Sequence, residues 1–172
     1  MTSRIWQDGA FHEDAWTRLA ADSDLPSDGS AIVVPLAVFL ADADRYAGYN
    51  GSLAVEVAPG ESVAPLERYL PRLPMIALAF PKFSDGRNYS NARLLRERYR
   101  YGGELRATGD VLQDQIPLMR RCGIDSFEVS HEPTARALLE DGLAEVHYYY
   151  QPVPSSAEIP AGTRPWARRP AD

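Results

Sequence analysis

Residues 80–115 read FPKFSDGRNYSNARLLRERYRYGGELRATGDVLQDQ, and the pattern in this stretch decides the fold. An apolar run ends at Phe80, and a polar loop follows it. We predict an arginine-rich helix over 90–101 and a strand over 104–108. A strand, a helix and a second strand in this order form the unit from which parallel sheets are built.

The same alternation extends to both sides of this stretch. We predict further strands at 31–34, 53–58, 75–80, 126–129 and 145–151, and further helices at 36–46, 63–70, 111–121 and 133–141. About six mostly parallel strands therefore belong to one α/β domain over 31–151. Residues 1–30 are expected at the periphery, with a short helix over 13–21. Residues 152–172 are rich in Pro and Arg and are expected to form an extended tail.

Charged residues inside the predicted strands distinguish between two architectures. A doubly wound open sheet buries both faces, so its strands are continuously apolar. Here Glu56 and Glu128 interrupt apolar runs, and Glu104, Arg106 and Thr108 share one face of their strand because side chains alternate. A parallel sheet with one polar face resembles the inside of a (βα) barrel. We therefore favour a curved, partial barrel-like sheet, completed by the N-terminal segment or by a second subunit, over the doubly wound alternative.

The composition narrows the class of protein. The chain has 172 residues, a net charge of -6 and a pI of about 5.1, which argues against a nucleic-acid-binding surface over the whole protein. Cys122 is the only cysteine, so no disulfide can form within the chain, as is typical of a reducing compartment. No apolar stretch has the length of a membrane span or the form of a signal peptide. We expect a cytoplasmic protein without membrane contacts.

The loop after Phe80 is the first candidate site. Lys82 and Arg87, together with the amides of a helix N-terminus capped by Ser90 or Asn88, would bind an oxyanion such as sulfate, sulfite, phosphate or a carboxylate. Asp85 would belong to the same substrate site and would orient groups or move protons. In the alternative interpretation, Asp85 and Arg87 pair with each other and brace the loop.

Two further clusters follow the next two strands. Arg106 with Asp110 would bind substrate and transfer a proton, or would form a buried ion pair. Glu128 with His131 would act as an acid–base pair, or His131 would simply be exposed.

The three histidines lack metal-ligand spacing, so we predict no metal site. The sequence contains no G-x-G-x-x-G, P-loop, C-x-x-C or G-x-S-x-G motif, and no cofactor can be identified from the residues.

Two other patterns suggest contacts with proteins. Arg93, Arg96, Arg98 and Arg100 either form a solvated helix face or dock on an acidic partner. The run Tyr148-Tyr149-Tyr150 in the last predicted strand either packs in the core or forms the edge of a homodimer.

Several short motifs together resemble a bacterial family, the domain-of-unknown-function family numbered 934. They are Phe80-Pro-Lys-Phe-Ser-Asp-Gly-Arg87, Tyr89-Ser90, Ala92-Arg93-Leu94-Leu95-Arg96, Gly103-Glu-Leu-Arg-Ala107, Gly109-Asp110-Val111-Leu112, Asp114-Gln115 and Arg121-Cys122-Gly123. The resemblance implies a role in assimilatory sulfate or sulfite reduction. It supplies no settled catalytic residues.

Three functions fit these residues. The first is an accessory protein of sulfate or sulfite reduction with an oxyanion pocket at the carboxyl ends of the strands. The second is a small barrel-type lyase or isomerase that acts on a small acid. The third is a non-catalytic module that docks on sulfite reductase or on another enzyme of sulfate assimilation. The residues alone do not decide whether the chain is an enzyme.

Overall fold

A computed structural model describes residues 4–140, 142–143, 158–161 and 164–170. The main strands are β1 (Arg4–Gln7), β2 (Ala10–Glu13), β3 (Thr17–Arg18), β4 (Ile32–Pro35), β5 (Leu53–Val57), β6 (Met75–Phe80), β7 (Glu104–Gly109) and β8 (Ser126–Val129). The helices are α1 (Leu36–Ala41), α2 (Ala43–Ala47), the 3-10 helix η1 (Ala64–Arg72), α3 (Arg87–Glu97), α4 (Ile116–Arg121) and α5 (Glu132–Glu140). No helix in these ranges is both long and apolar enough to cross a bilayer.

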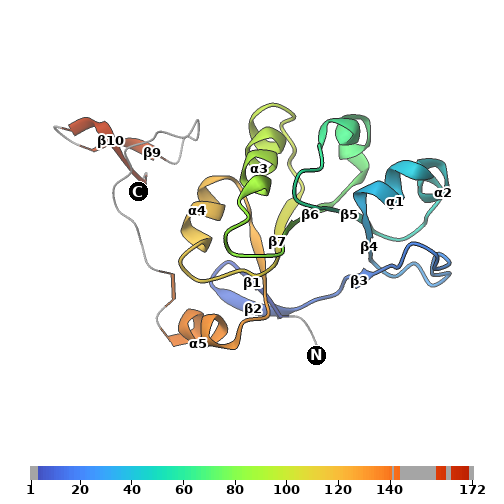
Figure 1. Cartoon of the computed structure of the whole chain (residues 1–172), viewed down its shortest axis with the longest axis horizontal. Coiled ribbons are helices and arrows are strands. Elements are labelled where there is room, and N and C mark those ends of the chain that lie inside the picture. Colours follow the sequence, from blue (N-terminus) through green and yellow to red (C-terminus); the bar gives the residue numbers. More distant parts are fainter. Residues whose placement is uncertain (1–3, 141, 144–157, 162–163, 171–172) are drawn as a thin grey trace.

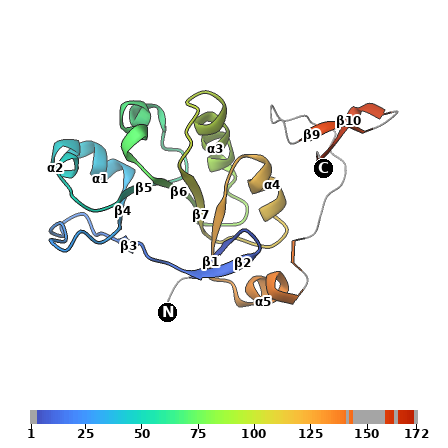
Figure 2. The same ribbon diagram turned by 180° about the vertical axis from the view of Figure 1, so that it is seen from behind.

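The eight strands form one sheet in the order β2-β1-β8-β7-β6-β5-β4-β3. Strands β3 to β8 run parallel, and β1 pairs antiparallel with both β2 and β8. The helices lie in an arc around the outside of the sheet, as both views show (Figure 1, Figure 2). The prediction of a curved, partial barrel of β-α units is therefore confirmed.

The length of one connection shows how strongly the sheet curls. Strand β2 ends at Glu13 and β3 begins at Thr17, although these strands form opposite edges of the sheet. In a flat sheet, seven strand spacings of about 4.8 Å would separate the two edges by roughly 34 Å. The four Cα steps from residue 13 to residue 17 reach at most about 15 Å. The sheet must therefore bend until its two edges approach each other.

The two faces of the sheet differ in chemistry. The outer face carries apolar side chains from alternate positions, and these pack under the helices to form the main core. Its largest fully buried members include Ile32, Ile76, Leu78, Phe80, Leu105 and Phe127. A smaller cluster on the inner face consists of Val33, Ala54, Met75 and Ala77, and Trp16 packs against it. The rest of the inner face carries polar side chains at Glu56, Glu104, Arg106, Thr108, Ser126 and Glu128, as the alternation of side chains predicts.

The N-terminal segment is part of the sheet. We expected 1–30 at the periphery with a helix over 13–21, and we named this segment as one of two candidates that could complete the sheet. It supplies three strands of the sheet, and the predicted helix is wrong. Thr17 donates from its backbone N–H to the Ala31 carbonyl at 2.9 Å, so the segment pairs with β4. Tertiary pairing outweighs the weak local preference for a helix.

Three other predicted helices also differ from the structure. The helix expected over 36–46 is divided at Asp42, whose carboxylate accepts a hydrogen bond from the Arg45 backbone N–H. The helix expected over 63–70 is a 3-10 helix with Pro65 in its first turn and Pro71 inside it. The helix expected over 111–121 begins only at Ile116, because proline at position 117 is tolerated in a first turn.

The C-terminal predictions have separate outcomes. In the tail that we expected to be extended, β9 (Glu158–Ala161) and β10 (Arg164–Pro170) form an antiparallel pair. The strand predicted at 145–151, and with it the tyrosine run proposed for a homodimer, lies outside the described residues.

Arg100 occupies a backbone conformation that favours glycine. Its φ is +53°, and it lies just after α3, where the chain turns toward β7. Replacing Arg100 with glycine should stabilise the protein by about 0.5–1 kcal/mol, because glycine adopts this region without steric cost. Urea unfolding measures the change.

The opposite substitution serves as the control. Gly123 has a φ of +92°, and a Cβ atom there would lie 2.5 Å from Cγ of Arg96. Gly123→Ala should therefore destabilise the protein by more than about 1 kcal/mol. A lower stability of Arg100→Gly would show that the Arg100 side chain makes a stabilising contact.

Candidate functional site

The loop between β6 and α3 is fixed to the segment that follows β7. The backbone N–H of Phe83 donates to Oδ2 of Asp110 at 3.1 Å, and its carbonyl accepts from Nε2 of Gln115 at 2.7 Å. Both polar backbone groups of Phe83 are thus held from outside the loop. The Phe83 side chain is nevertheless 61% exposed. The loop therefore presents an aromatic ring to solvent from a well-supported backbone.

Asp85 and Arg87 brace the same loop. Nε and Nη2 of Arg87 donate to the two carboxylate oxygens of Asp85 at 2.9 and 2.7 Å. The hydrogen bond from Arg87 lowers the pKa of Asp85, and the same bond raises the pKa of Arg87. The structure thus contains the pair that we gave as the alternative to oxyanion binding. Lys82 is exposed at the neighbouring turn.

The start of α3 differs from the predicted cap. The helix begins at Arg87 after Gly86, and no side chain caps it. Ser90 lies inside the first turns and is exposed, so the capping role proposed for Ser90 or Asn88 is wrong.

Asn88 has a different role, which the sequence did not reveal. Its Nδ2 donates to the carbonyls of Val57 and Ala79 at 3.0 and 2.8 Å, and its Oδ1 accepts from Asn91 at 2.8 Å. Asn88 is fully buried. One amide therefore ties α3 to the carboxyl ends of β5 and β6, and no other residue type of this size offers the same donors and acceptor.

Arg106 and Asp110 are not partners. Arg106 lies on the inner face of β7, where its Nη1 donates to Asp14 at 2.8 Å and its Nε donates to Glu104 at 2.9 Å. Only 6% of Arg106 is exposed. Asp110 lies beyond the end of the strand and holds the Phe83 backbone. Arg106 does form a buried ion pair, but its partners are Asp14 and Glu104 and not Asp110.

Glu128 and His131 also have separate partners. Oε2 of Glu128 accepts from Nη2 of Arg18 at 2.5 Å, inside the curled sheet. Nδ1 of His131 lies 2.9 Å from the Thr134 hydroxyl at the start of α5. The contacts of each residue thus differ from those of the predicted acid–base pair.

A second polar cluster on the inner face includes residues that the sequence interpretation missed. Arg18 contacts both Glu128 and Glu56, and the Thr108 hydroxyl donates to Glu56 at 3.1 Å. Burial acts to lower the pKa of Arg18, but its bonds to the two glutamates raise that pKa overall. Glu56 was recognisable as a charge within an apolar strand. Arg18 was not, because its segment was interpreted as a helix.

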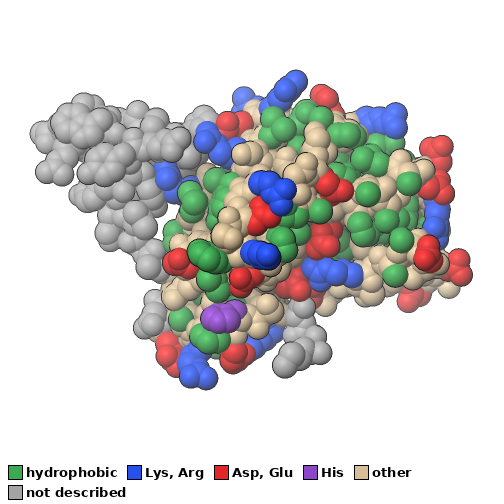
Figure 3. Space-filling model, in the orientation of Figure 1, with side chains coloured by type: hydrophobic (Ala, Val, Ile, Leu, Met, Phe, Trp, Pro, Cys, Tyr) green, Lys and Arg blue, Asp and Glu red, His purple; other side chains and the backbone are tan. Residues whose placement is uncertain are grey.

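The two inner clusters together are acidic. Four carboxylates, those of Asp14, Glu56, Glu104 and Glu128, face two guanidinium groups. Pairs of opposite charge are also visible on the molecular surface, where acidic and basic side chains lie next to each other at several places (Figure 3). This balance of charge disfavours an anion on the inner face. Among the described residues, no group of three or more His, Cys, Asp or Glu side chains could hold a metal ion.

The arginines of the predicted helix face divide into two kinds. Arg96 donates to the carbonyls of Gly123 and Gly103 at 2.9 and 2.8 Å, and it also pairs with Asp125. It therefore stabilises the fold. Arg93 pairs with Glu97 one turn along the helix. The two remaining arginines, Arg98 and Arg100, are exposed.

Cys122 does not show the environment of a reactive thiol. It is buried beside α3, and this burial raises its pKa, although the positive charges of Arg93 and Arg121 act in the opposite direction. Of our two interpretations, the structure agrees with the buried small residue.

The inner ion pairs should differ strongly in their effect on stability. Arg106→Ala leaves Asp14 buried without its partner and should cost about 3–5 kcal/mol. Arg18 is 45% exposed, so solvent screens its pairs, and Arg18→Ala should cost no more than about 1 kcal/mol. Urea unfolding of both variants tests this contrast. Equal losses would show that the curled sheet does not depend on the buried pair more than on the exposed one.

Comparison with known proteins places the chain in a family. The model of the family described as "Bacterial protein of unknown function (DUF934)" matches residues 54–159, which is more than half of the chain. The match includes the loop around Phe83, Asp110 and Gln115, whereas Asp14 and Arg18 lie before it. No curated protein and no solved structure matches the chain. The chain therefore belongs to the DUF934 family of bacterial proteins of unknown function.

Proposed function

We propose that this protein is an accessory protein of assimilatory sulfate or sulfite reduction that acts by docking on an enzyme of that process, with sulfite reductase as the leading partner. The pathway comes from the family resemblance described above. The mode of action comes from the loop at the carboxyl ends of the strands. We define the rim surface as Lys82, Phe83, Ser84 and Leu118.

The observation that carries the proposal is the presentation of Phe83. Aromatic side chains, Phe among them, are enriched in protein interfaces relative to the rest of the surface. Asp110 and Gln115 hold the Phe83 backbone from both sides, so little conformational freedom is lost when a partner binds. Leu118 is 50% exposed and lies one helical turn beyond Gln115, whose side chain bonds to the Phe83 carbonyl.

Docking fits these contacts better than an oxyanion pocket does. The charge of Arg87 is neutralised by Asp85, and that of Arg106 is neutralised by Asp14 and Glu104. Of the three cations expected to bind the anion, only Lys82 lies on the rim surface without such a partner among the described residues. The lyase or isomerase hypothesis assigned proton transfer to Asp110, and this carboxylate supports the loop instead.

Loss of the Phe83 ring should weaken docking without affecting the fold. Phe83→Ala should bind purified sulfite reductase from the same organism at least about tenfold more weakly, since central aromatic side chains contribute about 2 kcal/mol or more to binding. Calorimetry measures the affinity. The melting temperature should not change, because the ring is mostly exposed.

Leu139→Ala is the matched control. Leu139 is 64% exposed and lies on α5, outside the rim surface, so this variant should bind like the original protein. Equal affinity of the Phe83→Ala variant and the original protein would contradict the proposal. Failure of the original protein to bind sulfite reductase would exclude this enzyme as the partner.

Variants of Asp110 separate loop support from acid–base catalysis. Asp110→Ala removes the acceptor for the Phe83 N–H, so the amide protons of the loop should exchange faster and affinity should fall about two- to fivefold. Asp110→Asn keeps an acceptor oxygen and should retain most of the affinity. If Asp110 instead transferred a proton in catalysis, the Asn variant would lose as much catalytic activity as the Ala variant.

A further inference from the structure

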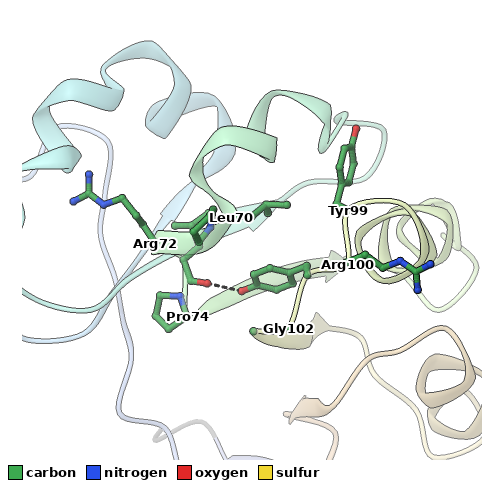
Figure 4. Close-up of a pocket in the computed structure, with 10 residues that line it drawn as sticks. Leu70, Arg72, Pro74, Tyr99, Arg100 and Gly102 are labelled. Carbon is green, nitrogen blue, oxygen red and sulfur yellow. Dashed lines mark hydrogen bonds between the residues drawn. The ribbon is translucent and has the colours of Figure 1, made fainter.

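A cavity of about 450 Å³ lies at the opposite end of the sheet from the rim surface. One wall is the segment 70–74, which joins η1 to β6, and the other is the loop 99–103, which joins α3 to β7 (Figure 4). The cavity is therefore next to the amino ends of β6 and β7. Its size falls within the range of cavities that hold small molecules or the side chains of a bound peptide.

The walls of the cavity combine apolar and polar surface, and a hydrogen bond joins them. Side chains of Leu70, Leu73, Pro74, Tyr99 and Tyr101 contribute to them. The Tyr101 hydroxyl donates to the Leu73 carbonyl at 2.8 Å and so joins the two walls (Figure 4). Burial raises the pKa of Tyr101, which keeps this donor protonated. An apolar side chain that enters the cavity would meet a surface that is already formed.

Two of the residues that line this cavity, Arg72 and Arg100, are arginines without a carboxylate partner among residues 4–140. Six arginines of the described side chains form ion pairs, namely Arg4, Arg18, Arg87, Arg93, Arg96 and Arg106. Within residues 4–140, the cavity-lining Arg72 and Arg100 form none, and the same holds for Arg45, Arg68, Arg98, Arg120 and Arg136, which do not line the cavity. Arg72 bonds only to the Ala47 carbonyl, and Arg98 lies over the Tyr99 ring. Arg72 and Arg100 extend outward from opposite sides of the cavity (Figure 4). Carboxylates outside the cavity could therefore pair with both.

Arg100 keeps its charge at a steric cost. A left-handed residue after a helix is usually glycine, and two glycines, Gly102 and Gly103, follow within three positions. Strained backbone residues are concentrated at functional sites. Together with the cavity and the unpaired arginines, the strain at Arg100 indicates that the charge serves binding and not folding.

We infer that this cavity is a docking groove for an acidic peptide segment of a partner protein. One apolar or aromatic side chain of the segment enters the cavity between Leu70 and Tyr101. Its neighbouring carboxylates pair with Arg72, Arg98 and Arg100. The net charge of -6 on the whole chain makes this local excess of positive charge selective, since acidic segments are repelled by most of the surface. This groove is independent of the rim surface and of the proposed function.

The first test uses peptide probes and the full chain. The probe is a fluorescein-labelled pentapeptide in which a central phenylalanine is flanked by two acidic residues on each side. We expect the protein to bind it at least tenfold more tightly in fluorescence polarisation than the peptide with central alanine or the peptide with amides in place of the acids. Added salt should weaken this binding. Equal binding of the three peptides, or no binding, would overturn the inference.

The second test uses variants of the protein. The double variant Arg72→Gln with Arg100→Gly should bind the acidic phenylalanine peptide at least tenfold more weakly. The control, Arg120→Gln with Arg136→Gln, removes the same amount of charge from exposed sites outside the cavity and should retain the affinity. If the control loses as much affinity as the double variant, the attraction is general and the groove is not the site.

The single variant Arg100→Gly distinguishes binding from misfolding. Its melting temperature should rise because the backbone strain is relieved, while its affinity for the peptide falls. A purely structural role of Arg100 cannot produce both changes together. An unchanged affinity in this more stable variant would remove Arg100 from the groove and contradict the inference.

Discussion

The short connection between β2 and β3 is the constraint on which the rest of the structure depends. Three residues join opposite edges of an eight-stranded sheet, so the sheet can exist only in a strongly curled form. The same connection carries Asp14, which pairs with Arg106, and it places Arg18 against Glu56 and Glu128. Backbone hydrogen bonds alone would leave the sheet open between β2 and β3. Ion pairs across the interior thus hold the curled shape.

This use of charge changes what the inner face can do. In a (βα) barrel, polar residues near the carboxyl ends of the inner face are the usual place for chemistry. Here the polar groups on the inner face are occupied with each other, and their net charge is negative. The features that remain for recognition lie at the two ends of the sheet. Phe83 stands on a supported loop at the carboxyl end, and a groove with two arginines in its walls lies at the amino end. We propose both as surfaces for partners.

The comparison between prediction and structure shows which kinds of signal were reliable. Charges at alternate positions in otherwise apolar strands identified the polar inner face, because the period of two is fixed by the geometry of a strand. For the predicted pairs, Arg106 with Asp110 and Glu128 with His131, the structure gives other contacts: Arg106 bonds to Asp14, Asp110 to the Phe83 backbone, Glu128 to Arg18 and His131 to Thr134. We assumed that residues close in sequence at a strand end would meet. Arg106 and Glu128 lie on strands and point inside the curled sheet, whereas Asp110 and His131 lie beyond the strand ends and turn outward. Asn88 was overlooked because a polar residue near a helix start suggests a cap, and nothing local shows that its amide is buried.

The sequence by itself determined the alternation of strands and helices, the presence of one polar face and the family. These properties depend on local periodicity and on short motifs, which each segment carries independently of the others. The tertiary structure decided that the N-terminal segment, one of the two predicted alternatives, completes the sheet, and it alone showed that Arg18 and Asp14 are the partners of the inner charges and that Asp110 supports a loop. Among these contacts, Arg18 and Glu128 are 110 positions apart. Such contacts form only when the curl of the sheet brings distant segments together, and no local pattern encodes that distance.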